Sequence, residues 1–326
     1  MAGDRHRGSR RRAVVARSHP TALDPGGTNA VGRMLGLLGD EWNLLIIQQA
    51  VMGATRYSHF IARLPISNAV LTNRLRMLVT EGLLDRHGTE YRTTARSRSL
   101  WPLLLSIWEW ERTWVPDHAD RLPTMVHRSC GHRFTPVLRC SFCQRAGGAD
   151  TVGLELGPSG DWGRCAPSAV TRRRSDSHGD GRQAGLFPET MSVLGNRWAA
   201  ALLLAAFLGA VRFTEFQAQL GAPPSLLSER LLTFCDIGVL NCEPQPGVGE
   251  RGAYLLTAKG RAFFGILVTA LQWAQRWFVA PEGPAIAATH RGCGEMFAGE
   301  LACERCGARL AGAQVAVTRP EAAGIP

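Results

Sequence analysis

An internal repeat constrains this chain more than any other feature of the sequence. One set of residues recurs after 156 positions, namely Gly39, Trp42, Phe60, Arg74, Leu75 and Gly82 as Gly195, Trp198, Phe216, Arg230, Leu231 and Gly238. A second set recurs after 163 positions, namely Tyr91, Thr94, Arg98, Trp110, Trp114, His127, Cys130, Gly131, Phe134, Cys140 and Cys143 as Tyr254, Thr257, Arg261, Trp273, Trp277, His290, Cys293, Gly294, Phe297, Cys303 and Cys306. Two constant offsets separated by one insertion of seven residues are hard to obtain by chance, so we predict a tandem duplication. The insertion falls in residues 243–251, which are rich in Pro and Gly and therefore lengthen a loop.

The length and composition fit two globular domains. The 326 residues are enough for two ordinary cores, and a hydrophobic content of 45% argues against a disordered chain. The sequence has no uninterrupted run of about 18 apolar residues and no signal peptide at its start, so we expect a cytoplasmic, nucleoid-associated protein without a membrane partner. Nine cysteines in a chain of this length do not indicate a secreted disulfide scaffold. Clustered cysteines are therefore interpreted as metal ligands.

The positive charge lies mostly in two segments. Of the net charge of +10, residues 1–20 carry +5 and residues 171–183 carry +2. Basic tails of this kind point only weakly to nucleic acid, and a solvated tail is the simpler interpretation of the first 20 residues. Arg outnumbers Lys by 36 to one, which we attribute to a GC-rich genome.

Each copy has the pattern of a winged helix-turn-helix. In copy one, apolar spacing predicts three helices, over residues 31–38, 41–52 and 57–64. Ser67 is a good N-cap for a fourth helix that runs to residue 79 and has one buried stripe and one polar face. Gly82 closes that helix, and a β-hairpin (83–86 with 91–94) and a long helix (96–114) follow. The predicted fold is therefore mainly α with small β-hairpins, in which the short helix, the turn and the fourth helix place a polar helical turn where it can read a major groove.

Several motifs resemble the HxlR-type winged-helix regulators of bacteria. Copy one carries Gly39-Asp40-Glu41-Trp42, Arg56-Tyr57-Ser58-His59-Phe60, Leu71-Thr72-Asn73-Arg74-Leu75 and Glu81-Gly82-Leu83-Leu84. Copy two carries Gly195-Asn196-Arg197-Trp198, Arg212-Phe213-Thr214-Glu215-Phe216, Ser228-Glu229-Arg230-Leu231 and Tyr254-Leu255-Leu256-Thr257. The resemblance covers about 85 residues in each half. It implies a transcriptional regulator whose helix after the turn reads DNA and whose hairpin touches the DNA backbone. Members usually act as homodimers, so the two copies here imply an intramolecular pseudo-dimer, with further dimerisation of the chain as an alternative.

The expected partner is therefore double-stranded DNA, read by polar residues on the fourth helix and wing of each copy. We predict DNA contacts from Ser67, Asn68, Thr72, Asn73, Arg74, Arg76, Arg86, Ser225, Ser228 and Arg230. Residues 56–98 hold eight Arg against three acids, whereas residues 212–261 hold five basic residues against five acids, so we expect copy one to contribute more DNA affinity. Glu229 replaces Asn73 and Leu232 replaces Arg76 at the 156 offset. Arg74 and Arg230 have an alternative role, which is to pair with acidic neighbours.

A Cys/His cluster follows each winged helix, outside the region of resemblance. Copy one has His127-x2-Cys130-x9-Cys140-x2-Cys143, and copy two has His290-x2-Cys293-x9-Cys303-x2-Cys306. Three thiolates and one imidazole suit tetrahedral zinc, so we predict one structural, ribbon-like zinc knuckle per copy, each formed from its own four residues. A redox pair, a disulfide or vestigial ligands remain alternatives. Cys165, Cys235 and Cys242 have no counterparts; Cys235 is predicted to lie in the core.

The tryptophans of each last helix are expected to pack on the knuckle or the other copy, with a small-molecule pocket between domains as the alternative.

We find no catalytic motif and predict a non-enzymatic protein. The alternatives to a DNA-binding regulator are a protein-interaction module and a regulator that senses a small-molecule effector or redox state, with copy two not binding DNA. The predicted segments are a disordered basic arm (1–28), winged helix one (29–118), knuckle one (119–157), a linker (158–186), winged helix two (187–281), knuckle two (282–318) and a tail (319–326).

Overall fold

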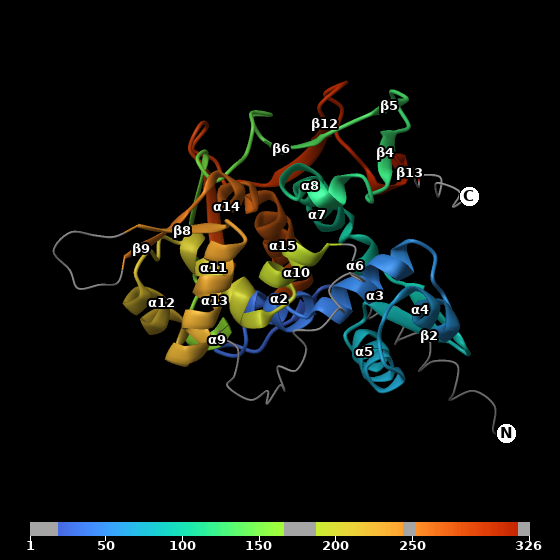
Figure 1. The fold of residues 1–326 in the computed structure, drawn as a ribbon, viewed down its shortest axis with the longest axis horizontal. Helices are drawn as coiled ribbons and strands as arrows, with labels where there is room; N and C mark the ends of the chain where they lie inside the picture. Colours follow the sequence, from blue (N-terminus) through green and yellow to red (C-terminus); the bar gives the residue numbers. More distant parts are fainter. Residues whose placement is uncertain (1–18, 166–186, 244–251, 319–326) are drawn as a thin grey trace.

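The computed structural model describes residues 19–165, 187–243 and 252–318 of the 326-residue chain. The described residues form helices and short strands (Figure 1). Their buried apolar side chains make one large core and a second, smaller cluster around Phe264 and Phe297. None of the helices in this part of the chain is long and apolar enough to cross a membrane. The predicted class, mainly α with small β-hairpins, is confirmed.

Copy one has the predicted order of elements. These are α2 (Ala30–Leu38), α3 (Glu41–Val51), α4 (Tyr57–Arg63), α5 (Asn68–Thr80), β2 (Leu84–His87) and β3 (Glu90–Thr93). The side chains of Asn29, Asp40 and Ser67 cap α2, α3 and α5 by accepting a backbone N–H from the first turn of each helix. Helices α4 and α5, the helix-turn-helix pair, contribute four side chains to the core that are no more than 1% exposed, namely Phe60, Leu71, Leu75 and Leu78.

Copy two repeats this order. Its elements are α10 (Pro188–Leu194), α11 (Arg197–Phe207), α12 (Phe213–Leu220), α13 (Pro224–Asp236), β8 (Leu240–Glu243) and β9 (Ala253–Leu256). The predicted loop insertion at residues 244–251 lies outside the described residues.

The last helix of copy one is interrupted, contrary to the prediction of one helix over 96–114. Residues Ala95–Arg98 form α6, and Trp101–Trp114 form α7. Pro102 fits the start of a new helix, because proline lacks an N–H and is accommodated in the first turn. It does not by itself account for the break, since copy two breaks at the equivalent place with Gly265 in the position of Pro102. Copy two has the matching pair α14 (Ala258–Ala262) and α15 (Phe264–Trp277).

The two copies pack through their helices around a pseudo-two-fold axis. Helix α15 of copy two lies against α2 and α7 of copy one. Trp110 donates its indole N–H to the carbonyl of Lys259 at 3.1 Å, and its counterpart Trp273 donates to the carbonyl of Arg96 at 2.9 Å. These reciprocal bonds confirm for Trp110 and Trp273 that a tryptophan of the last helix packs on the other copy, whereas Trp108 donates to the carbonyl of Pro123 in its own copy.

The glycines that precede α3 and α11 face each other across the same axis. Asp40 and Asn196, which occupy equivalent positions, form a β-bridge. A Cβ atom on Gly39 would lie 3.0 Å from the Cα of Arg197, and one on Gly195 would lie 3.3 Å from the Cα of Glu41. The repeated glycine therefore permits the close approach of the two backbones.

The strands after the winged helices are exchanged between copies. Strand β4 (Thr124–His127) of copy one pairs with β5 (His132–Arg133) and with β13 (Val315–Thr318) of copy two. Strand β7 (Val152–Leu156) of copy one pairs with β11 (Ile286–His290) of copy two. Strands β6 (Pro136–Cys140) and β12 (Gly299–Cys303) pair antiparallel, with Leu138 opposite its own counterpart Leu301 (Figure 1). The partner of β7 thus lies in the other copy.

Parts of the segments predicted as a disordered arm and a linker form regular structure that packs on the two copies. Strand β1 (Thr21–Ala22) pairs in parallel with β10 (Phe278–Val279) of copy two. Helix α9 (Trp162–Cys165) packs on α2 and α12. Arg96 also donates to the carbonyl of His19 and to the hydroxyl of Thr21. These contacts hold the segment in place, so the prediction of disorder is wrong for residues 19–28. Residues 1–18 and most of the predicted linker lie outside the described residues. Short helices also continue the chain after α7 (α8, Pro116–Ala119) and before β13 (η2, Gly312–Gln314).

Candidate nucleic-acid interface and metal centres

Helix α5, the predicted reading helix of copy one, presents a polar face to solvent. Ser67, Asn68, Thr72, Asn73 and Arg76 are all exposed on it. The Tyr57 hydroxyl on α4 donates to Asn68 Oδ1 at 3.0 Å, which ties the first turn of α5 to the preceding helix. Arg76 donates to Asn73 Oδ1 at 3.1 Å. The structure thus brings five of the predicted DNA-contacting residues onto one surface.

Arg74 has a structural partner instead of a free guanidinium. Its Nε and Nη2 bind the two carboxylate oxygens of Asp40 at 3.1 and 2.7 Å, in the bidentate geometry typical of Arg and carboxylate. Asp40 also caps α3 and lies at the contact between copies. Arg74 therefore fastens the reading helix to α3, which is the alternative role considered for it.

Helix α13, the predicted reading helix of copy two, has a different surface. Ser225 and Ser228 are exposed as predicted. Arg230 lacks the carboxylate that Arg74 has, because Asn196 replaces Asp40, and it lies 3.3 Å from Glu229 instead. Its buried Nε has no hydrogen-bond partner within the described part of the chain. Leu232 is 62% exposed at the position of Arg76.

The first wing is a hairpin of β2 and β3 with basic residues near its tip. Arg86 donates to the carbonyl of Gly88 at 3.1 Å and lies over the Tyr91 ring. Glu90 pairs with Arg92 at 3.0 Å and with Arg56 at 3.7 Å, and the hydrogen bond from Arg92 contributes most to lowering the pKa of Glu90. The second wing consists of β8 and β9.

The eight predicted metal ligands gather into two clusters, but the grouping differs from the prediction. One cluster contains His127, Cys130, Cys303 and Cys306, and the other contains Cys140, Cys143, His290 and Cys293. The ligand atoms in each cluster lie within 4.8 Å of one another. Each His-x2-Cys pair therefore meets the Cys-x2-Cys pair of the other copy, and the prediction of one self-contained knuckle per copy is wrong.

The pairing of β6 with β12 explains the exchange. Cys140 ends β6 and Cys303 ends β12, and because the strands run antiparallel their ends lie on opposite sides of the axis. Each end then meets the His-x2-Cys turn of the other copy. Sequence spacing alone cannot distinguish the two groupings, since both use the same eight residues.

Both clusters suit a closed tetrahedral site. His127, His290, Cys140 and Cys303 are buried, and their partners lie nearer the surface. Gly131 and Gly294 follow the first Cys with φ of 73° and 77°, a left-handed conformation that closes the turn. In these turns the amides of Gly131 and Gly294 donate to the carbonyls of His127 and His290, each at 2.8 Å. Three thiolates and an imidazole are ligands that zinc prefers.

The remaining cysteines lie outside these clusters. Cys165 is 5% exposed in α9, and burial raises the pKa of its thiol to about 12. Such a thiol is unreactive, which argues against a redox role for Cys165. Cys235 packs against the core as predicted, and Cys242 is exposed on β8.

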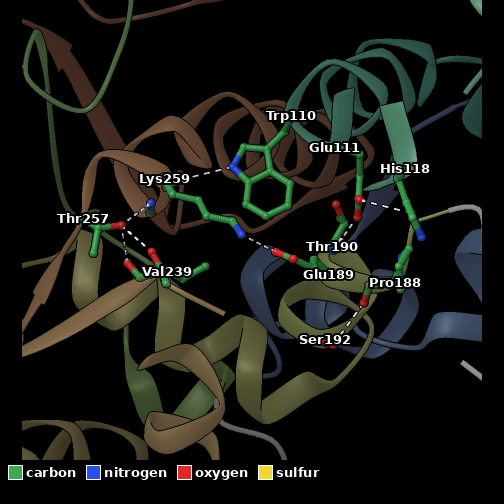
Figure 2. A network of polar contacts seen from close by, with 12 residues as sticks. Trp110, Glu111, His118, Pro188, Glu189, Thr190, Ser192, Val239, Thr257 and Lys259 are labelled. Carbon is green, nitrogen blue, oxygen red and sulfur yellow. Dashed lines mark hydrogen bonds and ion pairs between the residues drawn. The ribbon is translucent and has the colours of Figure 1, made fainter. Parts of the chain in front are cut away.

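Sequence reasoning missed a buried carboxylate at the contact between copies. Glu111 on α7 is fully buried, and its Oε1 accepts the Thr190 backbone N–H of α10 at 2.7 Å (Figure 2). Its Oε2 lies 3.9 Å from His118 Nδ1. Burial is the main cause of the raised pKa of Glu111. Because Ala274 stands at the equivalent position in copy two, the repeat gave no signal for this contact.

The family comparison agrees with the two winged helices. The model of the HxlR-like helix-turn-helix family matches residues 37–119 and residues 193–282, together more than half of the chain. This chain belongs to the HxlR-like helix-turn-helix family. The described clusters lie beyond both matched regions, so family membership does not account for them.

Relatives of this HxlR-like chain are named as transcriptional regulators. The HTH-type transcriptional regulator Rv3095 of Mycobacterium tuberculosis is 35% identical over 120 residues, covering 37% of this chain and 76% of the relative. YvaP of Bacillus subtilis, also named as an HTH-type transcriptional regulator, is 34% identical over 92 residues, covering 28% of this chain and 85% of the relative. The crystal structure of PA1607, named as a candidate transcription factor, is 31% identical with a TM-score of 0.37, covering 41% of this chain and 93% of that one.

Proposed function

We propose that the chain regulates transcription as an intramolecular pseudo-dimer that binds double-stranded DNA. The observation that carries this proposal is the pseudo-symmetric packing of the two family-matched winged helices. In that packing, Gly39 of copy one lies against Arg197 of copy two, and Gly195 of copy two lies against Glu41 of copy one. In dimeric helix-turn-helix proteins, two related reading helices address half-sites about one helical turn apart. Helices α5 and α13 would play these parts, in a non-enzymatic protein of the cytoplasm and nucleoid.

Copy one would supply most of the DNA affinity. Its reading helix exposes Asn73 and Arg76, whereas copy two exposes Glu229 and Leu232 at the same positions. Phosphate neutralisation dominates non-specific affinity, so the acidic and apolar replacements weaken the second contact. The 62% exposed Leu232 favours a second role for copy two, as a contact for a protein partner.

We further propose that both Cys/His clusters hold structural Zn²⁺. His127, Cys130, Cys303 and Cys306 would bind one ion, and Cys140, Cys143, His290 and Cys293 the other. Four protein ligands leave no position for an activated water, so zinc would crosslink the chain instead of supplying catalysis. Since each site draws on both copies, the ions would fix one copy relative to the other.

Selection from a random double-stranded DNA library with the purified full-length protein tests the proposal. We expect an enriched sequence with two related half-sites, bound specifically over scrambled DNA in fluorescence anisotropy. Failure to enrich any sequence, with the protein folded and zinc-loaded, would overturn the DNA-binding function and favour a protein-interaction module. Enrichment of a single half-site would retain DNA binding but contradict the proposed use of both copies.

A further inference from the structure

A cavity of about 490 Å³ lies at the contact between the copies, with α3, α7 and β4 of copy one and β13 of copy two around it. Its walls include Val51, Met52, Trp101, Trp108, Met125 and Val315. This volume falls in the range of small-molecule sites, which are mostly apolar with a few placed polar groups. No charged side chain is among the described residues that line it.

Gln48 is the one side chain with an amide among the described residues that line the cavity. It is 7% exposed, and its Oε1 has no hydrogen-bond partner among those described residues. Leaving such an acceptor buried and unpaired costs about 1–3 kcal/mol. A ligand that donates a hydrogen bond to Gln48 removes that cost.

The equivalent space in copy two is filled by the chain itself. Leu204 replaces Gln48, Phe207 replaces Val51 and Phe264 replaces Trp101 at the repeat offsets. Phe207 and Phe264 meet edge to face with ring centroids 5.8 Å apart, and Phe264 packs with Val152 and Val268. The open cavity and its amide therefore distinguish the helices of copy one from those of copy two, whose aromatic side chains fill the corresponding space.

We propose that this cavity binds a neutral, planar aromatic compound that carries one hydrogen-bond donor. The indole rings of Trp101 and Trp108 and the thioethers of Met52 and Met125 are among the lining groups, and both kinds of side chain suit an aromatic ligand. The absence of charged groups among the described lining residues disfavours an ionised ligand, because its charge would be desolvated without a partner. The donor pairs with Gln48 Oε1.

Equilibrium dialysis of the full-length protein against three probes tests the site. 2-Naphthol has the ring and the donor, naphthalene lacks the donor, and 2-naphthoate carries a charge. We expect saturable binding of one 2-naphthol per chain, weaker binding of naphthalene, and binding of 2-naphthoate at least tenfold weaker than that of 2-naphthol. Absence of saturable 2-naphthol binding, or a preference for 2-naphthoate, would overturn the proposal.

Two variants that copy the residues of copy two locate the bound molecule. Gln48→Leu should lower the affinity for 2-naphthol about 3- to 10-fold and leave that for naphthalene unchanged, since one hydrogen bond is lost. Val51→Phe should lower both affinities at least tenfold by filling the cavity. Val279→Phe, which adds the same side chain at another exposed site, is the matched control and should change neither. Thermal unfolding verifies that each variant folds; if Val51→Phe does not, Val317→Phe at the 47% exposed wall position replaces it. Equal losses for both probes in Gln48→Leu, or full binding by the filled variant, would contradict the assignment.

Discussion

His127 and Cys306 belong to different copies of the repeat, yet His127 Nδ1 lies 3.4 Å from Cys306 Sγ. The mirrored pair, His290 Nδ1 and Cys143 Sγ, lies at 3.3 Å. The same exchange recurs in the strands, since β4 pairs with β13 and β7 with β11. The copies are therefore interlocked through backbone pairing as well as through the clusters, and the chain is expected to unfold as one cooperative unit.

The glycines at the contact between copies should not tolerate a side chain. Gly39→Ala should lower the free energy of unfolding by about 1–3 kcal/mol, because the new Cβ would clash with the carbonyl oxygen of Leu35 in its own copy and press on the Arg197 backbone of the other copy. Gly36→Ala, three residues earlier on α2, is the control, since its Cβ would meet no atom within 4 Å. That change should raise stability by about 0.5–1 kcal/mol through helix propensity. Urea unfolding of both variants measures the difference, and equal effects would refute the close approach.

The reciprocal tryptophan bonds should contribute to stability from both sides of the axis. Trp273→Phe keeps a large ring but removes the donor to the Arg96 carbonyl, so stability should fall by about 1–3 kcal/mol. Trp110→Phe should have a similar effect at the Lys259 carbonyl. Trp114→Phe, at the end of α7, is the control. Chemical denaturation measures the three free energies of unfolding, and a larger loss in Trp114→Phe than in the other two variants would argue against this account.

The buried Glu111 should make stability depend on pH. Its pKa is raised above the ordinary value of 4.5 chiefly by burial, with Glu189 acting in the same direction and the Thr190 N–H and Lys259 opposing it. A raised carboxyl pKa means that the folded state favours the protonated form. The contribution of Glu111 is thus most favourable below about pH 4.5 and is lost as pH rises through the folded pKa.

Replacing Glu111 tests this dependence. Glu111→Gln keeps an acceptor for the Thr190 N–H and removes the ionisable group. The free energy of unfolding of this variant, minus that of the native chain, should therefore become more positive between about pH 5 and about pH 8. Glu111→Ala leaves that buried N–H unpaired and should destabilise by about 1–3 kcal/mol. His118 Nδ1 lies 3.9 Å from Glu111 Oε2, so His118→Gln in the same series separates the effect of this neighbour. An unchanged pH profile in Glu111→Gln would mean that Glu111 does not cause the dependence.

Exchanging one residue between the reading helices should redistribute DNA affinity. Arg76→Leu should weaken binding to the selected DNA and reduce the steepness of its salt dependence by about one unit, because one phosphate contact is lost. Leu232→Arg should have the opposite effect. Arg74→Ala is a poor probe, since it also breaks the ion pair with Asp40. Anisotropy titrations over a range of salt give the slopes, and identical slopes in the two variants would contradict a role of this position at the phosphates.

The sequence predicted what depends on local pattern. Caps such as Asp40 and Ser67 and the stripe through Leu71 and Leu75 defined the helices of copy one nearly to the residue. The break before α7 was not predicted, although Pro102 suits the first turn of a helix. The identity of the eight Cys/His residues followed from their repeated spacing.

What the sequence did not reveal depends on contacts between the copies. Equivalent residues of two copies carry identical spacing, so pairing His127 with Cys140 or with Cys303 leaves the same sequence pattern. Strand exchange is decided by the antiparallel register of Leu138 and Leu301, a tertiary property. The Glu111–Thr190 contact has no counterpart in copy two, so the repeat carried no trace of it.

Zinc stoichiometry in two double variants tests the exchanged clusters most directly. Cys130→Ser with Cys306→Ser removes two ligands from one cluster, and Cys130→Ser with Cys143→Ser removes one from each. A cluster that loses any ligand gains an open position and should release zinc to a chelator. We predict two chelator-resistant zinc ions in the native chain, one in the Cys130/Cys306 variant and none in the Cys130/Cys143 variant. One ion in the Cys130/Cys143 variant and none in the Cys130/Cys306 variant would contradict the exchange and restore a separate site in each copy.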